Sequence, residues 1–301
     1  MKTADFKGMM APVFTGFTKE YELNVSIVPQ YAEYLSRHKV KQVLVNGTTG
    51  EGVSMTTAER KLNLEAWMTE AKTHGFTVMV QIGGTCFQEV VELAKHAESL
   101  NVHAVLCLPE LFFTPASVED LVDYLRDVGE AAPATPLFYY HIPMFTRVTF
   151  DMEVFARKCL EAIPTFRGIK YTHTNLDELQ RIQSVDKALV CSLGCDQLIL
   201  AGMMYGCSSQ IATTINIFPD LIHSIYEDFA AGRYEQAQEE QNKLSKLTRA
   251  IAGKGSWVST MKPAMSKASG LDFGPVRKPL KCLTIEAISA IENLVVTARL
   301  S

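Results

Sequence analysis

The feature that most restricts the fold is a regular alternation of short apolar runs with longer amphipathic segments. The runs are rich in β-branched and aromatic residues and start about 20 to 37 residues apart, which leaves room for one helix and two loops between neighbours. There are eight of them, at residues 9–14, 40–46, 77–83, 104–109, 136–142, 166–172, 188–194 and 209–214. Strands joined through helices pair in parallel, so the spacing predicts an α/β fold with a parallel sheet.

The segments between the runs carry helix signals. Residues 56–72 begin with a threonine cap and a glutamate in the first turn, and residues 117–133 have apolar positions three and four apart and end at Pro133. Eight strand-helix units can close as a (β/α)8 TIM barrel or lie open as a doubly wound sheet. We expect the barrel, with additional C-terminal helices at residues 219–246, 260–268 and 284–299 packed against its side.

We expect one domain over residues 1–301. The chain of 301 residues is long for a single domain, but barrels of this kind reach roughly 250 residues as one unit. Residues 9–218 would supply the barrel strands and their helices, and residues 219–301 the last barrel helix and a C-terminal helical extension.

Composition excludes several classes of partner. With 47% hydrophobic and 21% charged residues the chain is typical of a compact protein, and a net charge of −4 gives no basic surface for nucleic acid. No run approaches the roughly 18 apolar residues of a membrane span, and the first ten residues lack the order of a signal peptide. We expect a cytoplasmic protein that binds neither nucleic acid nor membrane.

Cysteine usage agrees with that location. The seven cysteines are an odd number scattered through apolar segments, which indicates reduced thiols rather than a disulfide framework. Cys191 and Cys195 form a close pair, but no second Cys or His pair stands at metal-ligand spacing, so we expect no metal.

Polar residues at the carboxyl ends of barrel strands are the candidates for chemistry, because that face of the fold carries the active site. These ends hold Thr48 and Thr49 after the second run, Tyr140 in the fifth, Lys170 and Thr172 in the sixth, Asp196 and Gln197 after the seventh, and Thr213 in the eighth.

Lys170 lies inside the apolar string GIKYT. Its side chain must either reach solvent at the barrel mouth or point into the barrel, where loss of hydration favours the neutral amine. A neutral amine is the nucleophile that condenses with a ketone, and the iminium it forms accepts electrons from a breaking carbon-carbon bond. An ordinary lysine at the rim is the alternative interpretation.

The neighbouring motifs suit a keto acid. NGTTGEG, residues 46–52, offers two hydroxyls and a glycine-rich turn of N–H groups fitted to a carboxylate, although a plain tight turn remains open. In FYYHIP, alternation sends one of Tyr139 and Tyr140 inward, where a phenol can move protons or simply fill the core. We expect His141 and His173 to be structural histidines with satisfied hydrogen bonds.

Together, VNGTTGEG, FYYHIP and IPTFRGIKYT resemble the signatures of the dihydrodipicolinate synthase and N-acetylneuraminate lyase superfamily, most closely its animal lyase branch. The resemblance runs over nearly all of the chain. It implies a class I aldolase that cleaves N-acetylneuraminate reversibly to pyruvate and N-acetylmannosamine. Lys170 would form the Schiff base, Tyr140 would handle protons, and Thr48 with Thr49 would bind the pyruvate carboxylate. It also implies a homotetramer and no cofactor.

The chain departs from the family pattern at several positions. Phe145 stands where the synthase branch has an arginine, with Arg147 two residues further on. The lyases' sugar-binding turn reads Gly-x-Asp-Glu, whereas this chain has Gly194, Asp196 and Gln197. Gln197 can still hydrogen-bond hydroxyls, but without a charge.

At the end of the eighth run Ala212 and Thr213 replace the usual Gly-Ser. Gln197 and Thr213 therefore leave open an aldolase for a shorter keto acid, 2-keto-3-deoxygluconate or 4-hydroxy-2-oxoglutarate. A barrel that binds sugar acids without turnover is a further alternative.

Overall fold

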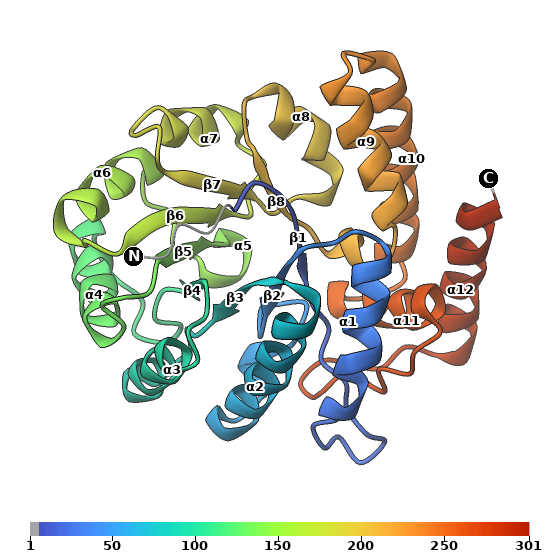
Figure 1. Cartoon of the computed structure of the whole chain (residues 1–301), viewed down its shortest axis with the longest axis horizontal. Helices are drawn as coiled ribbons and strands as arrows, with labels where there is room; N and C mark the ends of the chain where they lie inside the picture. Colours follow the sequence, from blue (N-terminus) through green and yellow to red (C-terminus); the bar gives the residue numbers. More distant parts are fainter. Residues whose placement is uncertain (1–5, 301) are drawn as a thin grey trace.

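The computed structural model describes residues 6–300, and within them eight parallel strands close into a barrel in chain order (Figure 1). This confirms the predicted TIM barrel. The strands are β1 (Gly8–Pro12), β2 (Gln42–Val45), β3 (Thr77–Gln81), β4 (Ala104–Cys107), β5 (Leu137–His141), β6 (Phe166–Tyr171), β7 (Val190–Leu193) and β8 (Ser209–Ile211).

Helices surround the barrel, one or more after each strand. They are α1 (Val28–Arg37), α2 (Thr57–His74), α3 (Phe87–Ser99), α4 (Val118–Ala131), α5 (Pro143–Thr146), α6 (Met152–Ala162), α7 (Leu176–Gln183), α8 (Ile199–Met204), α9 (Pro219–Ala230), α10 (Tyr234–Ala252), α11 (Trp257–Ser269) and α12 (Ile285–Leu300). The predicted threonine cap is confirmed, because Thr56 and Glu59 form a capping box at the start of α2. Ser117 and Asp120 form another at the start of α4, which was not predicted.

Strand alternation separates two hydrophobic clusters. Phe138 and Tyr140 of β5 point into the barrel with Leu44, whereas Tyr139 points outward and packs on Phe155 of α6 with ring centroids 4.7 Å apart. The inward positions of the strands fill the barrel, so its interior is a core rather than a channel.

Two predicted boundaries are wrong. The helix expected over residues 219–246 is two helices, α9 and α10, because Gly232 has a φ of +74°, a left-handed conformation that ends a helix. The eighth strand ends at Ile211 rather than at 214, because the next residues form a 3-10 turn, η4 (Thr213–Asn216).

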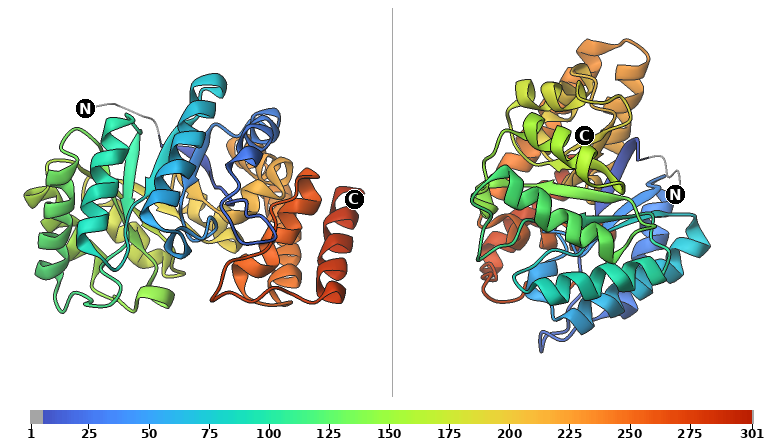
Figure 2. Two further views of the ribbon diagram at one scale, coloured as in Figure 1. Left: turned by 90° about the horizontal axis from the view of Figure 1, so that it is seen from below. Right: turned by 90° about the vertical axis from the view of Figure 1, so that its left-hand side faces the viewer.

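The C-terminal helices extend the molecule on one side of the barrel. α10, α11 and α12 contact one another, and α12 lies at the edge (Figures 1 and 2). The start of α11 approaches the carboxyl ends of the strands, because Trp257 donates a hydrogen bond to Thr213 in η4. Helix α11 therefore reaches the face formed by the carboxyl ends of the strands, as well as the side of the barrel that the sequence predicts.

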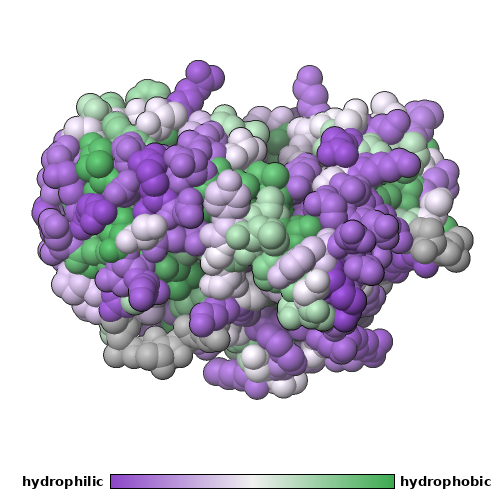
Figure 3. All heavy atoms as spheres, turned by 90° about the horizontal axis from the view of Figure 1, so that it is seen from above, coloured by the Kyte–Doolittle hydropathy of each residue, from purple (hydrophilic) through white to green (hydrophobic). Residues whose placement is uncertain are grey.

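The surface is mixed. On the face drawn in Figure 3, hydrophobic areas lie among larger hydrophilic ones, which is usual because polar atoms cannot cover a whole protein. In residues 6–300 no helix is both long enough and apolar enough to cross a bilayer.

Candidate active site

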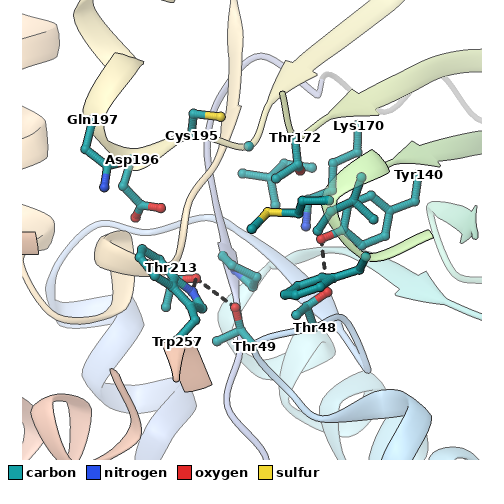
Figure 4. Close-up of a pocket in the computed structure, with 16 residues that line it drawn as sticks. Thr48, Thr49, Tyr140, Lys170, Thr172, Cys195, Asp196, Gln197, Thr213 and Trp257 are labelled. Carbon is teal, nitrogen blue, oxygen red and sulfur yellow. Dashed lines mark hydrogen bonds between the residues drawn. The ribbon is translucent and has the colours of Figure 1, made fainter. Parts of the chain in front are cut away.

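One cavity of about 270 Å³ lies at the carboxyl ends of the strands, and every residue predicted for the site lines it (Figure 4). These residues are Thr48, Thr49, Tyr140, Lys170, Thr172, Gly194, Asp196, Gln197 and Thr213. They come from five different strands or the loops that follow them, so the closure of the barrel brings them together.

Lys170 stands within β6 with its side chain in the barrel mouth. It is only 4% exposed, and its Nζ lies 4.2 Å from the centroid of the Tyr140 ring. The two residues are paired across β5 and β6, so strand register sets this contact. A buried amine beside a phenol and an open cavity can attack a carbonyl and exchange protons.

The loop after β2 supplies the floor of the cavity. The Thr48 Oγ1 lies 3.1 Å from the Tyr140 hydroxyl, and the Thr49 Oγ1 lies 2.8 Å from the Thr213 Oγ1. The loop folds back sharply at Gly52, where a Cβ would stand 1.8 Å from the Asn46 carbonyl oxygen. The resulting turn presents both hydroxyls to the cavity.

A buried ion pair that the sequence did not reveal holds this loop. Glu51 has a φ of +54°, and its carboxylate accepts hydrogen bonds from Lys262 Nζ of α11 at 2.8 Å and from the backbone N–H of Arg277 at 2.7 Å. The side chains of Glu51 and Lys262 are 0% and 1% exposed. The C-terminal extension thus fixes the turn that carries Thr48 and Thr49.

The opposite wall comes from the turn after β7. Asp196 and Gln197 face Lys170 across the cavity (Figure 4), and the Asp196 Oδ1 accepts a hydrogen bond from the Thr214 N–H at 2.7 Å. Burial raises the pKa of Asp196. At Gly194 a Cβ would stand 2.1 Å from the Thr172 Oγ1, so only glycine permits this approach. Among the described residues the Thr172 hydroxyl has no hydrogen-bond partner, which leaves it free for a ligand.

Trp257 is a wall residue that sequence reasoning missed. Its Nε1 donates to the Thr213 Oγ1 at 3.1 Å, and Thr213 in turn contacts Thr49. Trp257 stands just before an expected helix, but no nearby sequence feature indicates that it contacts Thr213, 44 residues earlier. Phe145 also lines the cavity, whereas Arg147 is exposed and does not line it. Arg147 therefore does not replace the missing arginine of the synthase branch.

The two histidines beside the site behave differently. His173 is exposed, and its Nδ1 lies 3.2 Å from the Tyr171 hydroxyl. His141 is 2% exposed, and within residues 6–300 its Nδ1 has no hydrogen-bond partner. The prediction of a satisfied structural histidine is therefore wrong for His141.

A closed barrel with a lysine buried at the carboxyl ends of its strands, beside a phenol and a hydroxyl-lined turn, is a (β/α)8 barrel with a cavity suited to Schiff-base chemistry on a small molecule. The chain belongs to the dihydrodipicolinate synthetase family, whose profile matches residues 5–298.

Similar proteins are found within that family. The chain is 33% identical to the N-acetylneuraminate lyase of Xenopus tropicalis over 275 residues, 91% of this chain and 90% of the relative. It is 30% identical to the N-acetylneuraminate lyase of Homo sapiens over 289 residues, 95% and 90% of the two chains. Its fold matches the solved Proteus mirabilis N-acetylneuraminate lyase with a TM-score of 0.93 at 29% identity, covering 97% of this chain and 98% of that one.

Proposed function

We propose that the protein is a class I aldolase that cleaves N-acetylneuraminate reversibly to pyruvate and N-acetylmannosamine. The observation that carries the proposal is the buried Lys170 amine, which lies against the Tyr140 ring in a cavity whose floor is lined by two threonine hydroxyls. Pyruvate fits this floor, because a carboxylate can accept hydrogen bonds from Thr48 and Thr49 while its keto carbon meets the Lys170 Nζ.

The reaction begins when the Lys170 amine attacks the C2 ketone of the open-chain sugar acid and water leaves. The iminium that forms withdraws electrons from C3. Removal of the proton from the C4 hydroxyl then breaks the C3–C4 bond, and its electron pair moves toward the iminium to give an enamine. N-acetylmannosamine departs as the aldehyde.

The remaining steps return the enzyme to its starting state. The enamine takes a proton at C3, water adds to the iminium carbon, and pyruvate leaves with the amine restored on Lys170. Tyr140 is the group placed to pass these protons, since its hydroxyl stands in the cavity beside Lys170 and 3.1 Å from Thr48 Oγ1. The lysine iminium is itself the electron sink, so no metal or organic cofactor enters the cycle.

The far wall is suited to the polyhydroxyl part of the substrate. Asp196, Gln197 and Thr213 offer acceptors and donors on the side opposite Lys170, and Thr172 adds a hydroxyl beside Lys170. Both relatives and the solved structure described above are named N-acetylneuraminate lyases, which favours that substrate over a shorter keto acid.

The test is pyruvate release from N-acetylneuraminate, measured beside 2-keto-3-deoxygluconate and 4-hydroxy-2-oxoglutarate. Borohydride added with pyruvate should inactivate the enzyme and leave the reduced adduct on Lys170. Lys170→Ala should abolish release and adduct while the circular dichroism spectrum is kept, and Lys267→Ala, an exposed lysine of α11, should behave as wild type. Normal turnover by Lys170→Ala would disprove the Schiff-base mechanism. Pyruvate release only from a shorter keto acid would disprove N-acetylneuraminate as the substrate.

We further propose that the enzyme works in the cytoplasm as a homotetramer. All seven cysteines are free, which suits a reducing compartment. In the segments that follow β4 and β5, Phe112, Phe113 and Phe145 are 75%, 81% and 59% exposed, and exposed apolar side chains of this kind are often buried by association. Light scattering on the purified protein should give four times the chain mass of 33.4 kDa, and a monomer mass would refute the tetramer.

A further inference from the structure

Behind the active site, between the barrel wall and the outer helices, three potential metal ligands come together. They are His141 at the end of β5, His173 in the loop after β6, and Glu178 on α7. One ligand atom from each lies within 4.8 Å of the others. The strand register explains the meeting, because His141 pairs with Tyr171 and both point outward, while Tyr140 and Lys170 point inward.

His141 is the fixed member of this group. Its ring is 2% exposed and stacks on the Tyr171 ring, with centroids 5.2 Å apart and planes 17° from parallel. Within the described part of the chain its buried Nδ1 makes no hydrogen bond. This nitrogen is therefore available to a ligand.

Tyr171 hydrogen-bonds both of the other two ligands. Its hydroxyl donates to Glu178 Oε2 at 2.5 Å and lies 3.2 Å from His173 Nδ1. Hydrogen bonds of this kind orient metal ligands in proteins. His173 is exposed and Glu178 is half-buried, and the second carboxylate oxygen of Glu178, Oε1, accepts a hydrogen bond from the Met152 N–H at 3.3 Å.

We propose that His141, His173 and Glu178 bind a divalent transition-metal ion, with Zn²⁺ as the best fit and water as the fourth ligand. Two imidazoles and a carboxylate are a usual donor set for zinc. Bonds of about 2.0 to 2.1 Å in a tetrahedral site place ligand atoms roughly 3.3 Å apart, so the three ligand atoms, which lie within 4.8 Å of one another, would draw closer around a bound ion.

The bound ion would join three elements around the catalytic strands. It connects the end of β5, the loop after β6 and α7, and Thr172 of the cavity lies between Tyr171 and His173. Binding to the folded chain therefore stabilises this corner of the barrel. The site is separate from the cavity and takes no part in the Schiff-base chemistry.

The experiment is calorimetric titration of the chelator-treated full chain with Zn²⁺. Because Cys86 and Cys282 are exposed thiols, it is run in the variant that carries Cys86→Ser and Cys282→Ser. One equivalent should bind and raise the melting temperature, and His173→Asn or Glu178→Gln should weaken binding by at least about tenfold. X-ray absorption of the loaded protein should show nitrogen and oxygen ligands only.

His96→Asn is the matched control. His96 also has a buried Nδ1 without a partner and lies 2.9 Å from Glu65, but among the described residues these two belong to no group of three ligands. This variant should bind Zn²⁺ as the parent does. Absence of stoichiometric binding, equal binding by His173→Asn, or loss in His96→Asn as large as that in His173→Asn would overturn the proposal.

Discussion

Replacing Lys262 by methionine should destabilise the protein strongly through a single buried charge. Methionine keeps much of the length and apolar character of the stem, so little packing is lost. The Glu51 carboxylate, 0% exposed, would lose the ammonium 2.8 Å away and keep only the Arg277 N–H as a donor. Breaking a buried pair by removing one partner costs about 3 to 5 kcal/mol, and the remaining hydrogen bond places the expected loss near about 3 kcal/mol.

Urea unfolding followed by circular dichroism measures this loss. Lys267→Met is the matched control, because Lys267 lies on the same helix as Lys262, α11, and pairs with Glu292 of α12 at 3.7 Å, with side chains 39% and 41% exposed. An exposed pair of this kind contributes about 1 kcal/mol at most. The double variant Glu51→Gln/Lys262→Met has neither buried charge. It should therefore recover at least about 1 kcal/mol of the unfolding free energy that Lys262→Met loses.

A free energy of unfolding for Lys262→Met equal to that of Lys267→Met would refute the argument. Additive effects would refute it too. If the double variant were less stable than Lys262→Met by the whole loss in unfolding free energy that Glu51→Gln causes alone, the two side chains would be acting independently.

Three further outcomes follow from the site and its surroundings. Tyr140→Phe should lower kcat by roughly 10²-fold or more, while Tyr139→Phe, outside the barrel, should not; equal rates would return Tyr140 to a packing role. Gln197→Glu should raise kcat/KM for N-acetylneuraminate by about fivefold through charge-assisted hydrogen bonds, and no gain would place the substrate hydroxyls elsewhere. Arg277 holds the pKa of Glu59 at about 2, so the wild-type protein should lose stability as the pH falls from 5 to 2 and this carboxylate is protonated. The melting temperature of Glu59→Gln should fall less over the same range, because that variant has no carboxylate to protonate.

The architecture could be predicted from the sequence because its signals depend on residues that are close together in the chain. Apolar runs and caps such as Thr56 with Glu59 depend on neighbours within a few residues, and each strand was found within about three residues of its place. The site followed from the fold, since parallel strands must end on one face. Gly232 was not predicted to end a helix, because a single glycine inside a helical pattern does not show whether its φ will be positive.

What escaped prediction depends on contacts between distant parts of the chain. Trp257 reaches Thr213, and Lys262 reaches Glu51 across 211 residues. Neither residue stands in a motif, and a lysine in a helix is ordinarily solvated. The unpartnered Nδ1 of His141 could not be predicted either. Strand alternation indicates which face of the sheet a side chain is on, but not which groups surround it.

These distant contacts connect the C-terminal helices to the candidate site. Helix α11 contacts the loop after β2 directly, because Lys262 pairs with Glu51, and indirectly, because Trp257 contacts Thr213, which contacts Thr49. The threonine hydroxyls are therefore held in position by a segment that the eight-stranded barrel does not need for closure. Damage to α11 should weaken substrate binding even while the barrel stays folded, because the turn that bears Thr48 and Thr49 would lose its buried anchor.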